Sequence, residues 1–142
     1  MESKKKVLVL LYRKNSQQAL EVLALRRVPQ RGGFWQPVTG NVEAGESLEN
    51  AALREVKEET NISSILQTID LGLDETFVKN ELTFIEHAFA MEVDYSERIS
   101  LESNPSKEHC DSIWISYDGA FEMFNFPHQR DALNKLFKHF YS

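Results

Sequence analysis

Three glutamates, Glu55, Glu58 and Glu59, lie within the stretch REVKEET at residues 54–60. On an α-helix, where each residue turns the chain by about 100°, these side chains share one arc of roughly 100°. Carboxylates at this spacing repel one another by about 0.2–0.5 kcal/mol per pair on an exposed helix. Two interpretations account for such a face. It is either a solvated helix surface or a site for a hard divalent cation, which binds oxygen ligands and relieves the repulsion.

The residues before these glutamates favour the cation site. The segment TGNVEAGES (39–47) places Gly40 and Gly45 around a short loop that leads into the helix. Such a loop can bring backbone carbonyls to a cation and backbone amides to a phosphate. The protein also has a formal net charge of −6, so an anionic substrate needs a cation between it and the protein. Mg²⁺ typically joins a few carboxylates to substrate phosphates in this way.

The helix that carries the glutamates is predicted over residues 48–60. Ser47 suits its N-terminal cap, and Asn61 suits a left-handed C-terminal cap. The face that packs on the rest of the protein is an apolar stripe at helical spacing, Leu48, Ala51, Ala52 and Val56. We therefore expect the glutamates to project from the opposite side.

The rest of the chain alternates between strands and helices. Residues 6–14 form an apolar run that predicts a strand buried on both faces, paired as a hairpin with residues 21–28. Further extended segments are expected at residues 34–43, 64–73, 81–93 and 111–117, with a polar loop at 96–109 and an amphipathic helix at 128–140. This order predicts one α+β domain over residues 1–142, with a mixed sheet in layers.

Composition narrows the class of protein. The chain has 142 residues, 42% of them hydrophobic and 27% charged, which is typical of a single globular domain. The net charge of −6 argues against a nucleic-acid partner or an anionic membrane surface. Cys110 is the only cysteine, which excludes an intrachain disulfide and a cysteine-rich zinc site. The apolar run 7–12 is too short for a signal peptide or a membrane span, so we expect a cytoplasmic protein.

Residues 40–62 resemble a known motif, the Nudix box, G-x5-E-x7-R-E-U-x-E-E-x-G-U, in which U is a bulky aliphatic residue. The chain departs from it at Asn61, which replaces the last glycine at a position that asks for a cap conformation asparagine tolerates. The matching residues are Gly40, Glu46, Arg54, Glu55, Val56, Glu58, Glu59 and Ile62. The resemblance implies the Nudix fold, an α/β/α sandwich whose box is a loop-helix-loop.

The resemblance also implies a function. Nudix hydrolases use Mg²⁺ or Mn²⁺ to cleave a diphosphate linked to another group. Carried onto this chain, Glu55, Glu58 and Glu59 would be metal ligands, together with the carbonyl of Gly40. Arg54 and Glu46 would pair and hold the loop against the helix. Water would attack one phosphorus while a carboxylate takes its proton, and the glutamate that does so varies within the family.

The substrate is indicated by segments outside the box. FWQPVTG (34–40), EHCDSIWIS (108–116) and HQRDAL (128–133) resemble the bacterial dihydroneopterin triphosphate diphosphatases. We therefore expect a nucleoside triphosphate-like small molecule, such as dihydroneopterin triphosphate, cleaved between its α and β phosphates to release pyrophosphate. Two alternatives remain open, a dinucleoside polyphosphate hydrolase and a catalytically silent module that binds a nucleotide. The complete set of glutamates counts against the silent module.

Three residues outside the box are candidates for substrate binding. Arg26 and Arg27, with Arg31 nearby, have guanidinium groups that can bind phosphate, although a solvated basic strand end is an equally good interpretation. Trp35 can stack on a flat base or pterin, as can its neighbour Phe34, or these rings can belong to the core.

Glu108 is a candidate catalytic residue. It lies at the end of the polar loop, just before the aromatic strand, where a carboxylate can complete a metal's ligands or accept a proton from water. The alternative is a solvated loop glutamate. The histidines His87, His109 and His128 have no spacing typical of metal ligands, and we expect each to be an ordinary side chain.

Overall fold

The central strand β1 (Lys4–Lys14) organises the fold that a computed structural model describes for residues 3–102, 104 and 106–141. Its residues 7–12 are all at most 1% exposed, as the apolar run predicts. Successive side chains point to opposite faces of a strand. Val7, Val9 and Leu11 therefore enter one hydrophobic core, while Leu8, Leu10 and Tyr12 enter a second core on the other face.

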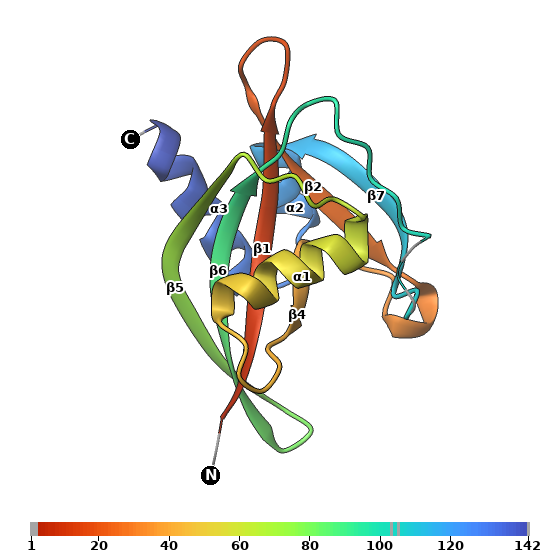
Figure 1. Ribbon diagram of the computed structural model, residues 1–142, viewed down its shortest axis with the longest axis vertical. Helices are drawn as coiled ribbons and strands as arrows, with labels where there is room; N and C mark the ends of the chain where they lie inside the picture. The colour runs from red at the N-terminus through yellow and green to blue at the C-terminus, as the bar shows by residue number, and fades with distance from the viewer. Residues whose placement is uncertain (1–2, 103, 105, 142) are drawn as a thin grey trace.

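The other elements pack around β1 in three layers (Figure 1). The sheet order is β3-β2-β1-β6-β5, with β4 paired to β1 and β7 paired to β2, and β1 and β6 are parallel. Helix α1 lies across one face of the sheet, and α2 and α3 lie on the other. This confirms the predicted α/β/α sandwich with a mixed sheet. The elements are β2 (Leu20–Arg27), a 3-10 turn (Pro29–Arg31), β3 (Trp35–Gln36), β4 (Val38–Asn41), α1 (Leu48–Thr60), β5 (Gln67–Lys79), β6 (Leu82–Glu92), β7 (His109–Ser116), α2 (Tyr117–Met123) and α3 (Pro127–Tyr141).

Local backbone conformations explain where the elements differ from the sequence expectations. The strand expected at residues 64–73 runs from Gln67 to Lys79 instead. The strand ends at Lys79 because Asn80 and Glu81, with φ of 53° and 65°, form the tight turn that leads into β6. Helix α2 was not expected; the side chain of Ser116 caps it by accepting a hydrogen bond from the Gly119 amide. Of the predicted loop 96–109, residues 103 and 105 lie outside the described residues.

Helix α1 has the predicted boundaries and caps. Ser47 accepts a hydrogen bond from the Asn50 amide at 3.1 Å, and Asn61 has left-handed angles of φ 63° and ψ 18°. The buried residues Ala51, Ala52 and Val56 face the sheet at 0% exposure. Among the described helices, none combines the length and apolar character that a bilayer span needs.

The cap at Asn61 generates a stability prediction. Asn61→Gly should change the free energy of unfolding by less than about 0.5 kcal/mol, because glycine adopts the left-handed conformation without strain. Asn61→Val should lower it by about 1–2 kcal/mol, the cost of that conformation for a residue with a Cβ branch. Denaturant unfolding of both variants checks this. Equal stabilities would contradict the cap's role.

Candidate active site

Helix α1 and strand β4 approach each other closely at Gly40. A Cβ atom on this residue would lie 2.0 Å from the Cδ atom of Glu55, so only glycine leaves room for the carboxylate there. The side chain of Glu55 is 13% exposed as a result. Burial raises its pKa, an effect that Arg54 opposes with a hydrogen bond of 2.9 Å from its Nη1 atom.

Arg54 ties the loop before α1 to the helix. Its Nε and Nη2 atoms donate to the two carboxylate oxygens of Glu46 at 2.9 and 3.0 Å, and Nη2 also donates to the Asn41 carbonyl at 2.8 Å. The hydrogen bonds from Arg54 lower the pKa of Glu46 to about 2. The pairing of Arg54 with Glu46, which the family resemblance implied, is therefore confirmed.

The three helix glutamates differ in their access to solvent. The Glu58 side chain is 45% exposed, that of Glu55 13% and that of Glu59 3%. Within the described part of the chain, neither carboxylate oxygen of Glu59 has a hydrogen-bond partner. Burial, followed by the nearby charges of Glu55 and Glu108, raises the pKa of Glu59 well above its ordinary value. The acidic face of α1 thus begins at Glu58, which is exposed, and ends at Glu59, whose buried carboxyl group has no hydrogen-bond partner among the described residues.

Glu108 reaches this carboxyl group from outside the helix. Potential ligand atoms of Glu59, Glu108 and His109 all lie within 4.8 Å of one another. The backbone carbonyl of Glu108 accepts a hydrogen bond from the Val28 amide at 2.9 Å, which anchors this end of the loop. Its side chain is 31% exposed and lies 3.7 Å from Arg31. The structure therefore brings Glu108 close to Glu59, in agreement with the first of the two interpretations of this residue, while its catalytic role stays a prediction.

His109 is the member of this cluster that sequence reasoning missed. Its Nδ1 atom lies 3.2 Å from Glu59, and its Nε2 atom is hydrogen-bonded to the Gln36 side-chain amide at 3.0 Å. Burial lowers its pKa to about 4, so the ring is neutral at neutral pH. Because Nε2 accepts from the Gln36 amide, the proton of the neutral ring is on Nδ1, which faces Glu59. A β-bulge explains the position, because Arg27 pairs with His109 and Arg26 with Asp111, which leaves Cys110 as the extra residue. In the sequence, the only sign that His109 belongs to this cluster is that it directly follows Glu108.

The donors in this cluster fit a hard divalent cation. Buried polar atoms normally have partners, yet both Glu59 oxygens and the His109 Nδ1 atom have none among the described residues. Carboxylate oxygens suit Mg²⁺ and Mn²⁺. A cation here would compensate the buried charge and the repulsion between the glutamates.

A cleft of about 1190 Å³ has lining residues on both faces of the sheet and includes Gln36, whose side chain is hydrogen-bonded to His109 of the cluster. Alternate residues of an extended strand face opposite sides, so Thr39 and Asn41 face the core under α3 while Gly40 faces α1. Its lining on the α1 side includes Arg27, Phe34 and Gln36, and on the α3 side Phe77, Phe84, Glu86, Phe126 and His128. The loop residues Glu43 to Glu46 line it as well.

The structure separates the three predicted substrate-binding residues. Arg27 lines the cleft, and its buried Nε atom has no hydrogen-bond partner in the described part of the chain. Arg26 instead donates to the Gly33 carbonyl at 3.1 Å, and Trp35 packs against the core under α3. Of the described residues, the cleft lining includes Arg27 but neither Arg26 nor Trp35, so their role in substrate binding stays a prediction.

Comparison with proteins of known sequence gives two sets of relatives. A dihydroneopterin triphosphate diphosphatase from Haemophilus influenzae is 32% identical over 142 residues, covering 91% of this chain and 84% of the relative. An Escherichia coli protein of the same name is 36% identical over 85 residues, 59% of this chain. A Myxococcus xanthus octanoyltransferase is 36% identical over 118 residues, 80% of this chain. The chain spans 54% of the E. coli protein's length and 31% of the M. xanthus protein's.

Solved structures agree on the fold. The structure of the E. coli dihydroneopterin triphosphate pyrophosphohydrolase has a TM-score of 0.77 and 25% identity, covering 98% of this chain and 99% of that one. A Caenorhabditis elegans Ap4A hydrolase has a TM-score of 0.76 at 22% identity, covering 96% of both chains, and shows the shared fold alone. The family model described as the NUDIX domain matches residues 3–137, and this chain therefore belongs to the Nudix family.

Proposed function

We propose that this protein is a metal-dependent hydrolase that cleaves a diphosphate linkage in a nucleoside triphosphate-like small molecule. The observation that carries the proposal is the buried carboxyl group of Glu59, which has no hydrogen-bond partner among the described residues and lies close to Glu108 and His109. A buried carboxylate without a partner is costly to keep in a folded protein unless a cation compensates it. Membership of the Nudix family supports the same reaction class.

The cation would be held by Glu55, Glu58 and Glu59 with the Gly40 carbonyl, and Glu108 is close enough to Glu59 to join them. When bound, Mg²⁺ or Mn²⁺ neutralises phosphate oxygens and makes water a stronger nucleophile. Side chains of the protein then bind the substrate's phosphate and accept the proton of the attacking water. Arg27 offers its unpaired Nε–H to a phosphate in the cleft. Glu108, which is partly exposed, accepts the proton of the attacking water.

Dihydroneopterin triphosphate is the substrate we propose, cleaved between its α and β phosphates with release of pyrophosphate. The two relatives of that name, at 32% and 36% identity, support it. The alternative of a dinucleoside polyphosphate rests on a likeness of fold at 22% identity, and is therefore the weaker choice. We keep the cytoplasm as the expected location, because the exposed cysteine Cys110 is free and suits a reducing compartment.

A substrate panel tests this function. Dihydroneopterin triphosphate, the nucleoside triphosphates and diadenosine tetraphosphate are each incubated with the protein, with and without Mg²⁺, while pyrophosphate and phosphate are measured. We expect Mg²⁺-dependent pyrophosphate release, with dihydroneopterin triphosphate giving the highest kcat/KM. Glu58→Gln should lower kcat by about a hundredfold, the scale of one preorganised electrostatic group. Full activity in excess chelator would refute the metal dependence, and a higher kcat/KM for diadenosine tetraphosphate would reverse the choice of substrate.

The role of Glu108 gives a separate prediction. Glu108→Gln should lower kcat by about a hundredfold and leave KM and the thermal unfolding midpoint nearly unchanged, because its carboxylate acts in the transition state. Glu102→Gln is the matched control, since Glu102 is an exposed glutamate earlier in the same loop. Steady-state kinetics of both variants check the prediction. Equal, near-normal values for the two would exclude Glu108 as the proton acceptor.

A further inference from the structure

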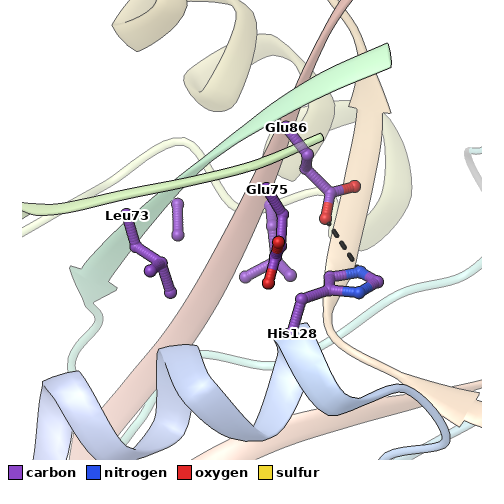
Figure 2. Close-up of a pocket in the computed structure, with 6 residues that line it drawn as sticks. Leu73, Glu75, Glu86 and His128 are labelled. Atoms are coloured by element: carbon purple, nitrogen blue, oxygen red, sulfur yellow. Dashed lines mark ion pairs between the residues drawn. The ribbon is translucent and has the colours of Figure 1, made fainter. Parts of the chain in front are cut away.

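The cleft contains a second buried carboxyl group on the opposite face of the sheet from α1. Glu86 on β6 is 5% exposed, and its Oε1 atom has no hydrogen-bond partner among the described residues. The Nε2 atom of His128, at the start of α3, lies 3.1 Å from this oxygen as an ion-pair contact (Figure 2). No part of the proposed hydrolytic chemistry uses these two residues.

The side chains around Glu86 leave its carboxylate able to accept further hydrogen bonds. Glu75 on β5 pairs in register with Glu86, and both carboxylates face the same small cavity as His128 (Figure 2). Two carboxyl groups therefore share a single imidazole. That cavity has a volume of about 10 Å³, the lower limit for one water molecule, so a ligand ring cannot enter it. Glu86 also lines the large cleft, which is the side from which a ligand can reach it.

Flat aromatic rings lie next to this carboxyl group. The ring of His128 is within 12° of parallel to those of Phe126 and Phe77, at centroid distances of 5.8 and 6.0 Å. Phe84 stacks on Phe77 at 5.4 Å and 19°. These side chains could simply form core packing. However, all of them line the cleft, and Phe126 is 39% exposed, so part of its ring is accessible to a planar ligand, whereas the Lys6 ammonium lies over the Phe84 ring.

The distance from Glu86 to the part of the cleft near Arg27, where we expect the phosphates, is within the length of one small molecule. Lys6 pairs in register with Glu86 on one side and with Asn41 on the other, so Asn41 lies two strand spacings, about 10 Å, from Glu86. Asn41 lines the cleft, as do Arg27 and Gln36 on the α1 side of the sheet. A heterocycle beside Glu86 would thus direct its sugar or side chain and its phosphates toward Arg27 and the acidic cluster.

The chemistry of a carboxylate selects the kind of heterocycle. An ionised carboxylate only accepts hydrogen bonds, and its two oxygens suit a pair of parallel donors. Guanine and pterin present such a pair, a ring N–H beside an exocyclic amino group. Adenine presents an amino group beside a ring nitrogen that is itself an acceptor, which would face the second oxygen unfavourably.

We propose that Glu86 determines specificity by binding the edge of a pterin or guanine ring that carries the ring N–H and the 2-amino group, with His128 as the residue that positions its carboxylate. The proposal rests on the proposed function for the direction of the phosphates. The preference for this ring edge is independent of hydrolysis.

Binding of nucleoside monophosphates tests the proposal, since GMP, IMP and AMP contain no diphosphate linkage to cleave. Isothermal titration should give GMP an affinity at least about tenfold above that of AMP, the scale of a hydrogen bond to a charged group. IMP, which lacks the 2-amino group, should lie between them. Glu86→Gln should remove most of the GMP preference and leave AMP binding unchanged. Glu122→Gln on α2 is the control, because it makes the same charge change at an exposed site and should alter nothing.

The outcomes separate this proposal from the proposed function. Equal binding of GMP and AMP by the wild type would overturn the ring specificity, whether or not the Glu86 variant folds. A Glu86→Gln variant that lowers the thermal midpoint without changing the GMP-to-AMP ratio would assign Glu86 a structural role only, and would also overturn it. A clear GMP preference in a protein that hydrolyses none of the triphosphates would support the ring site and refute the hydrolase.

Discussion

The contact between α1 and the backbone of β4 at Gly40 is the constraint on which the rest of the site depends. Because no side chain separates the two elements, Glu55 lies against the strand and Glu59, a turn further along the helix, is carried into the interior. Arg54 compensates part of the negative charge, but its guanidinium group is also bonded to Glu46 and Asn41. The cluster therefore keeps more carboxyl groups than cations, a state that low dielectric makes unfavourable without a bound metal.

Strand β4 also lies between two sets of polar side chains, one on each face of the sheet. Its residues alternate between the face that carries the acidic cluster and the face that carries Glu86 and His128. A ligand in the cleft can therefore place its phosphates and its ring on different sides of the same strand. If the proposed ring site and the proposed hydrolytic site are both correct, the rigid sheet fixes the distance between them, and a single substrate must match both.

The parts of this account that sequence could predict are those encoded locally. Ser47, Asn61 and the apolar stripe determine the ends and the buried face of α1, and the resemblance to the Nudix box implied the pairing of Arg54 with Glu46. Glu108 was also expected near the cluster, from its place before β7.

Other parts depend on tertiary contacts that local patterns do not contain. His109 turns inward because a bulge in β7 shifts the register against β2, and no spacing in the sequence indicates that bulge. Arg26 and Arg27 look equivalent as neighbours, yet the alternation of β2 sends only Arg27 into the cleft. Glu86 and His128 meet because α3, from the far end of the chain, packs on β5 and β1, the strands on either side of β6, and no local pattern associates the two residues.

The central claim is that the buried carboxyl group of Glu59 belongs to a divalent-cation site. Thermal unfolding of the wild type and of Glu59→Gln, each with and without millimolar Mg²⁺, tests it without depending on any substrate. Without metal, the variant should be at least as stable as the wild type, because it replaces a buried carboxyl group, whose ionised form is unfavourable there, with a neutral amide. Mg²⁺ should raise the midpoint of the wild type by about 2–4 °C, as expected when a ligand binds only the native state, and should have little effect on the variant. Equal Mg²⁺-induced shifts in the two proteins, or none in the wild type, would contradict the account.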